Sequence, residues 1–153
     1  MPYAGFQRYF VTTCTAFRRP LLRDDETVRQ ILRQIEALAR QMEFAVVAYC
    51  FMPDHLHLLI IANSEASDLQ RFVKQLKQMT GYSYRQQHRK SLWQPGFHER
   101  ILRNDEATLD VARYVLENPV RAKLAKELGD WPFAGSCVYS WPELLTAWDH
   151  EQT

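Results

Sequence analysis

The sequence predicts an α+β domain, a ferredoxin-like antiparallel sheet with helices packed on one face. The first observation is the order of the periodic segments, β, α, β, β, α, β, α, which suits a sheet with segregated helices. The second is a Pro-Asp turn at residues 52–54 between two β-rich runs, which predicts a hairpin. The third is composition, because 153 residues that are 46% hydrophobic suffice for one sizeable core but not for two full domains.

The first strand and the first helix precede this hairpin. Residues 9–17 (YFVTTCTAF) are rich in Thr, Val and aromatic residues, and the basic turn at 18–20 halts the strand. Asp24 and Asp25 open an acidic first turn, after which apolar residues recur at helical spacing. We expect an amphipathic helix that ends near Met42.

The hairpin strands span residues 44–51 and 55–62, and a second helix follows them. Ser67 or Asp68 is expected to cap this helix, whose apolar residues form a core stripe. Gly81 is expected to interrupt or end it.

A fourth strand and a third helix complete the predicted body. The alternating run at 97–102 predicts the strand. Asn104 is expected to cap the helix, two acidic residues suit its positive end, and Pro119 stops it. We therefore predict a catalytic domain of residues 1–126. The acidic, aromatic segment 127–153 is predicted to pack on it as a tail with a short helix.

Charge is unevenly distributed, although the formal net charge is only +1. All 19 Lys and Arg lie within the first 126 residues, and no acidic residue occurs between Asp68 and Glu99, which predicts a basic surface there. The three cysteines are scattered, the apolar runs are too short to span a bilayer, and no signal peptide is visible. We therefore expect a cytoplasmic protein without a membrane partner.

His55 and His57 are the sharpest chemical feature. Side chains alternate along a strand, so the two imidazoles lie on one face while Leu56 points to the other. Such a pair can hold a divalent cation. Two histidines at a strand end are also often ordinary surface or hydrogen-bonded residues, and the pair alone leaves both interpretations open.

Tyr114 and Asn118 lie four residues apart, on one face of the predicted third helix. A phenol with a pKa of about 10 is a poor nucleophile unless a nearby cation stabilises the phenolate or polarises the target phosphate. An amide oxygen one turn further on can complete a metal shell. Taken alone, Tyr114 is more simply a packing tyrosine, and Asn118 a residue that ends a helix before proline.

Together, residues 52–60 (MPDHLHLLI) and 112–122 (ARYVLENPVRA) resemble the single-tyrosine HUH transposases, the IS200/IS605-like or Y1 transposase family. Residues 118–122 (NPVRA) are most similar to its branch of REP-associated tyrosine transposases. The resemblance runs from about residue 9 to residue 124 and includes 92–97 (LWQPGF).

This resemblance implies a metal-dependent transposase and nickase that recognises hairpins of palindromic repeats in single-stranded DNA. It implies that His55, His57 and Asn118 hold Mg²⁺ or Mn²⁺ and that Tyr114 attacks the DNA phosphate. A 5′-phosphotyrosine and a free 3′-OH would result, and a strand 3′-OH would reverse the step without ATP. The lack of a Walker-type phosphate loop in the sequence agrees with this mechanism.

The basic surface fits such a substrate, because Lys and Arg neutralise phosphates and aromatic rings stack on unpaired bases. Tyr82, Tyr84 and Trp93 are the candidates for stacking. The candidate DNA-binding residues are Arg18, Arg19, Arg71, Lys74, Lys77, Arg85, Arg89, Lys90 and Arg121. Without the motifs, the same segment is interpreted as a solvated helix face.

Two other functions stay open on the sequence alone. One is a domesticated protein that binds structured single-stranded DNA without cutting it, and the other is a phosphoesterase that uses water. Resemblance to the REP-associated branch implies a monomer, because members of that branch look monomeric. The aromatic tail also has enough area to cover a surface that a dimer would bury. We therefore expect a monomer in which Tyr114 acts in cis, with a homodimer as the alternative.

Overall fold

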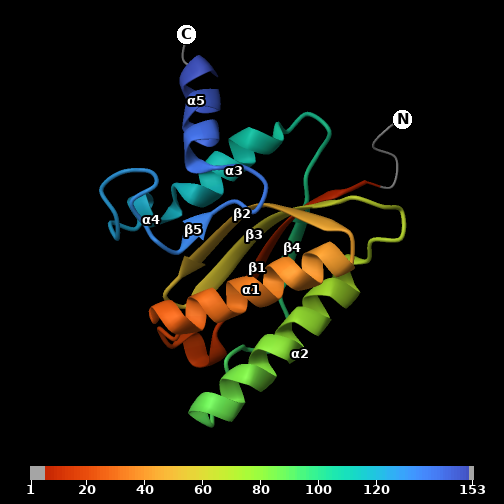
Figure 1. Cartoon of the computed structure of the whole chain (residues 1–153), viewed down its shortest axis with the longest axis vertical. Coiled ribbons are helices and arrows are strands. Elements are labelled where there is room, and N and C mark those ends of the chain that lie inside the picture. The colour runs from red at the N-terminus through yellow and green to blue at the C-terminus, as the bar shows by residue number, and fades with distance from the viewer. Residues whose placement is uncertain (1–5, 152–153) are drawn as a thin grey trace.

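A five-stranded antiparallel sheet forms the centre of the molecule (Figure 1). The computed structural model describes residues 6–151. The strands lie in the order β4-β1-β3-β2-β5, and the first four have the arrangement of a ferredoxin-like sheet, which confirms the predicted α+β class. Their bounds are β1 (Arg8–Cys14), β2 (Phe44–Met52), β3 (His55–Ala62), β4 (His98–Ile101) and β5 (Ala134–Gly135).

The helices cover both faces of the sheet, so the prediction that all of them lie on one face was wrong in this respect (Figure 1). On one face, α1 and α2 bury Leu58 and Ile60 of β3. On the other face α3 buries Leu59, and α5 packs against α3. The bounds are α1 (Asp25–Gln41), α2 (Leu69–His88), α3 (Thr108–Leu116), α4 (Asn118–Arg121) and α5 (Trp141–Glu151).

A β-bulge in β2 contributes to this two-sided core. The register shifts between Val46 and Ala48. Before the bulge Phe44 and Val46 face α1 and α2, whereas Ala48 and Cys50 after it face α3. An extra residue in a strand moves every later side chain to the opposite face. Both faces of β2 are therefore apolar, and helices must bury both of them.

The second helix continues through Gly81 to His88, so the predicted interruption at Gly81 does not occur. The buried face of the helix persists beyond the glycine, because Thr80 and Tyr84 are both buried. Thr80 donates its hydroxyl proton to the carbonyl of Leu76, and it accepts a hydrogen bond from the indole of Trp93 at 2.8 Å.

The third helix begins at Thr108, after Ala107, rather than after the predicted cap Asn104. Glu106, which was predicted to lie in the first turn of this helix, makes its contacts ahead of the helix instead. The carboxylate of Glu106 accepts the backbone N–H of Arg103 at 2.6 Å and pairs with Arg100 at 2.8 Å. These contacts close a separate turn ahead of the helix.

The C-terminal segment contacts the body through two tryptophans. Trp131 donates its indole N–H to the carbonyl of Phe51 at 2.9 Å, and Trp148 of α5 donates to the carbonyl of Leu109 at 3.1 Å. Trp148 is buried, and the guanidinium of Arg113 lies over its ring. The division at residue 126 stays a prediction. Within residues 6–151, no helix has both the length and the apolar character needed to cross a bilayer.

We expect Trp148→Ala to lower the free energy of unfolding by about 3–5 kcal/mol, because it removes a buried indole and leaves a cavity against α3. Leu145→Ala on the exposed side of the same helix should cost less than about 1 kcal/mol. Urea unfolding of both variants measures the difference. Equal and small effects would contradict the docking of α5.

Candidate functional site

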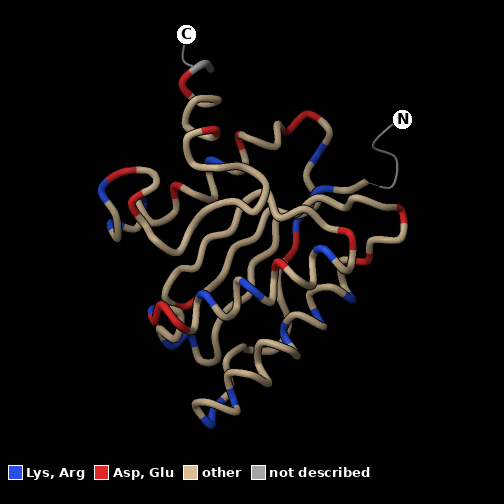
Figure 2. Tube along the Cα trace, in the orientation of Figure 1, with Lys and Arg blue, Asp and Glu red and all other residues tan. Residues whose placement is uncertain are grey.

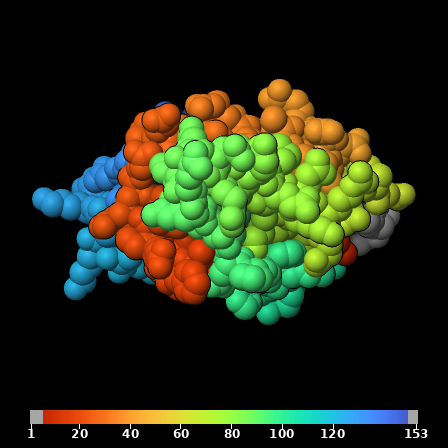
Figure 3. Space-filling model, turned by 90° about the horizontal axis from the view of Figure 1, so that it is seen from below, coloured from red at the N-terminus to blue at the C-terminus, as the bar shows by residue number. Residues whose placement is uncertain are grey.

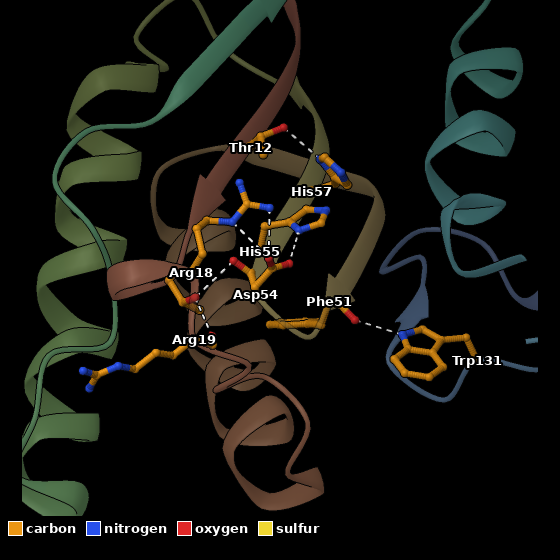
Figure 4. Close-up of polar contacts among 9 residues, drawn as sticks. Thr12, Arg18, Arg19, Phe51, Asp54, His55, His57 and Trp131 are labelled. Carbon is orange, nitrogen blue, oxygen red and sulfur yellow. Dashed lines mark hydrogen bonds and ion pairs between the residues drawn. The ribbon is translucent and has the colours of Figure 1, made fainter. Parts of the chain in front are cut away.

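The two histidines lie on β3, beside the end of β1. Their ring centroids are 4.6 Å apart, and both rings lie on the face of the sheet that α3 covers (Figure 4). The antiparallel register sets His55 opposite Cys14 and His57 opposite Thr12. Strand alternation therefore brings the two imidazoles together, as the sequence predicted.

Each imidazole is held through its Nδ1 atom by a polar neighbour. Nδ1 of His55 lies 2.7 Å from a carboxylate oxygen of Asp54, and Nδ1 of His57 lies 2.8 Å from the hydroxyl of Thr12 (Figure 4). Among residues 6–149, Nε2 of neither ring makes a hydrogen bond. A proton on Nδ1 leaves the Nε2 lone pair free, which is the arrangement of metal-binding histidines.

Asp54 is itself fixed by Arg18. The guanidinium of Arg18 lies 2.9 Å from the other carboxylate oxygen. Burial raises the pKa of Asp54, but the hydrogen bonds from His55 and Arg18 outweigh it and hold the pKa below its usual value. The carboxylate therefore stays charged near neutral pH and keeps accepting from His55.

Burial lowers the pKa of His57 to about 4, with smaller contributions from the charges of His55 and Arg121. The imidazole of His57 is therefore neutral at pH 7, as a metal ligand must be. The ring of Phe10 packs against it at 5.2 Å between centroids.

The donor set fits a divalent cation that also accepts oxygen ligands. Two imidazoles whose Nε2 atoms make no hydrogen bond within residues 6–149 can provide two ligands of such a shell. Among the residues that the structure describes, no group of three or more His, Cys, Asp and Glu is placed to hold a metal ion. Asn118, partly buried at the start of α4, is the predicted further ligand, and its role stays a prediction. Imidazole ligands suit Mn²⁺ better than Mg²⁺, which prefers oxygen.

Tyr114 lies on α3, the helix that covers the histidine face. Its side chain is 60% exposed and lines a cavity of about 510 Å³ together with Phe10 and Asp110. Phe10, which lines this cavity together with Tyr114, also packs against His57. The guanidinium of Arg121 lies over the Tyr114 ring, 4.0 Å from its centroid.

A second hollow, here called the basic groove, lies between α2 and residues 91–97. It has a volume of about 790 Å³. Figure 2 shows blue Lys and Arg positions along α2, and Figure 3 shows α2 beside the segment that follows it. The lining residues that carry charge or an aromatic ring are Arg71, Lys74, Lys77, Tyr82, Arg85, Trp93 and Phe97.

Two residues that were predicted to contact DNA from this surface make contacts within the protein instead. The ammonium of Lys77 donates to the carbonyls of Gln94, at 2.8 Å, and Gly96, and burial lowers its pKa. Tyr84 is buried in the core under α2, so the suggestion that it stacks on bases was wrong. Tyr82, by contrast, is 68% exposed at the groove.

The remaining predicted DNA contacts are dispersed. Arg18 lies at the histidine site, and Arg19 stacks on the exposed ring of Phe17. Arg89 is the C-terminal cap of α2, and Lys90 follows it, outside the residues that line the basic groove.

Sequence reasoning missed Thr12 and the role of Asp54. The position of Asp54 directly before His55 could have indicated a carboxylate that orients the imidazole. The hairpin turn already explained the presence of this aspartate, so no second role was predicted. Thr12 lies 45 positions from His57, and only the strand register brings the two together.

The family model described as "Transposase IS200 like" matches residues 7–118. A REP-associated tyrosine transposase of Escherichia coli K12 is 27% identical over 135 residues, which cover 84% of this chain and 80% of that protein. A Haemophilus influenzae Rd protein assigned to the same group is 30% identical over 104 residues, which cover 60% of this chain and 58% of the relative.

Several solved structures are similar in fold. One of them is a REP-associated tyrosine transposase bound to a REP hairpin, and it matches 84% of this chain and 75% of its own with a TM-score of 0.71 and 24% identity. That likeness shows the fold. The family model covers well over half of the sequence, including both histidines and the helix tyrosine. The chain therefore belongs to the IS200-like transposase family.

Proposed function

We propose that this transposase is a metal-dependent nickase and strand transferase that acts on hairpins in single-stranded DNA. The observation that carries the proposal is the position of Tyr114 on α3, a helix that covers the face bearing His55 and His57. A nucleophile and two oriented imidazoles on the same side of a sheet can act on one phosphodiester. Membership of the transposase family supports this use of the site.

In the proposed reaction, the phenolic oxygen of Tyr114 attacks phosphorus and displaces the 3′ oxygen of the preceding nucleotide. A 5′-phosphotyrosine forms and a 3′-OH is released, so bond energy is conserved for strand joining. Asp54 and Thr12 orient the imidazoles of His55 and His57. The bound Mn²⁺ or Mg²⁺ would supply Lewis-acid stabilisation of the phosphate charge. We retain the monomer prediction with Tyr114 acting in cis.

The basic groove is the proposed DNA-binding surface. It combines the cations Arg71, Lys74 and Arg85 with the exposed aromatic Tyr82, a combination that suits phosphates next to unpaired bases. A related transposase is known bound to a REP hairpin, which supports a hairpin of palindromic repeats as the ligand here.

We expect Tyr114→Phe to abolish the covalent protein–DNA adduct while hairpin affinity stays nearly unchanged. The variant loses the attacking oxygen but keeps the ring that Arg121 contacts. Denaturing electrophoresis after incubation with labelled hairpin DNA and Mn²⁺ measures the adduct. Tyr82→Phe is the matched control and should retain it. An adduct with the Tyr114 variant would assign the reaction to another tyrosine.

We also expect His55→Ala and His57→Ala each to remove Mn²⁺-dependent cleavage, because each leaves one imidazole where two are needed. His88→Ala, which removes an exposed histidine from the end of α2, should behave as wild type. Calorimetric Mn²⁺ titration should show lost affinity in the first two variants alone. Undiminished cleavage in both would exclude the metal site. Wild-type protein that binds hairpins without an adduct would instead favour the non-cleaving alternative.

For the basic groove, we expect the double variant Lys74→Gln, Arg85→Gln to weaken hairpin binding and to flatten its salt dependence. Two lost contacts with single-stranded phosphates should lower the slope of log K against log salt by about 1.4. Arg33→Gln, Arg40→Gln removes the same charge from the exposed side of α1 and is the control. Equal slopes in the two double variants would indicate that the basic residues of α2 form a solvated helix face and do not bind DNA.

A further inference from the structure

Tyr114 needs a group that holds its ring in place. Its side chain is 60% exposed, and among residues 6–149 its hydroxyl makes no hydrogen bond. Exposed side chains change rotamer within picoseconds to nanoseconds. A reacting group displaced by about 1 Å can lose about 100-fold in rate. The proposed reaction therefore depends on a constraint from outside the tyrosine itself.

Arg121 provides three contacts around this residue. Its guanidinium carbon lies 4.0 Å from the centre of the Tyr114 ring, well within the range of cation–π attraction. One guanidinium nitrogen donates to the backbone carbonyl of Tyr114 at 2.7 Å. Another lies 3.9 Å from the carboxylate of Glu117. The guanidinium is thus tied to the helix that carries the tyrosine.

The break between α3 and α4 makes this reach possible. Pro119 lacks a backbone N–H, so the helix ends at Leu116 and a short new helix starts at Asn118. The last carbonyls of a helix have no partner within it. Arg121 comes from the new helix and donates to one of them, on Tyr114.

Arg121 also lies on the side of the sheet that bears the histidine pair. Its guanidinium is hydrogen-bonded to α3, and α3 covers the face to which strand alternation directs His55 and His57. Its charge therefore adds to the positive potential on the side where the proposed phosphodiester would bind.

We propose that Arg121 is a positioning residue for Tyr114, and that its stacked guanidinium orients the phenol toward the phosphate bound beside His55 and His57. This inference rests on the proposed function. The bond from Tyr114 oxygen to phosphorus forms as the bond to the 3′ oxygen breaks. The phenolic proton leaves to solvent, and the 3′ oxygen takes up a proton. Arg121 exchanges no proton in the step.

The test compares Arg121→Met, Arg121→Lys and the nearby exposed control Lys126→Met. Single-turnover adduct formation is measured at saturating hairpin DNA with Mn²⁺, and hairpin affinity separately. We expect the Arg121→Met rate to fall about 100-fold, with affinity reduced no more than in the control. Arg121→Lys should recover part of the rate, because lysine keeps the charge but not the planar stack.

Mn²⁺ affinity without DNA is the second readout. Arg121→Met should bind Mn²⁺ at least as tightly as wild type, since a repelling charge is gone. Weaker Mn²⁺ binding would overturn the inference, because it would indicate damage to the histidine site. A rate within about threefold of wild type, or a loss confined to hairpin affinity, would also overturn it. A wild-type protein that forms no adduct would reject the proposed function and this inference together.

Discussion

Strand β3 is apolar on both of its faces, and the arrangement of the other elements depends on covering both. Leu58 and Ile60 are buried under α1 and α2, and Leu59 is buried under α3. Strand periodicity places His55 and His57 on the α3 side. The helix that removes Leu59 from water is thus the same helix that carries Tyr114. Burial of an ordinary leucine therefore brings Tyr114, the proposed nucleophile, to the histidine face.

The histidine site is supported from outside by a turn with unusual backbone geometry. Phe17 and Arg18 both have positive φ angles, 56° and 55°, which cost non-glycine residues free energy. The compensation is local. Thr15 donates its hydroxyl to the carbonyl of Arg19 at 2.7 Å, and Arg18 pairs with Asp54. This conformation directs the Arg18 guanidinium at the carboxylate that orients His55 (Figure 4).

Local patterns carried most of the fold prediction. The hairpin and the cap of α2 at Asp68 depend on neighbours within a few residues, and both are present. The two-sided cover was not predicted, although residues 58–61 of β3 are apolar on both faces. The bulge that turns Ala48 toward α3 adds a second apolar strand face there, and nothing in the sequence indicates it. The cap at Asn104 failed because Glu106 has stronger partners in Arg100 and Arg103.

In the candidate site too, local features could be predicted from the sequence and long-range contacts could not. The histidine pair and the tyrosine are visible as short motifs, whereas Thr12 joins them only through strand register. Arg121 was included as a possible DNA contact, and its stack on Tyr114 depends on the break at Pro119. Tyr84 could not be separated from Tyr82 by composition, since only the direction of each around α2 decides which is buried.

Lys77 joins the two walls of the basic groove. A lysine usually meets nucleic acid as a mobile, hydrated charge. Here its ammonium donates to two carbonyls of residues 94–96, and these bonds tie the wall opposite α2 to the helix. A preformed groove loses little conformational entropy on association. If the proposed DNA hairpin binds here, such a groove would discriminate by the width of a stem or bulge and not by its base sequence.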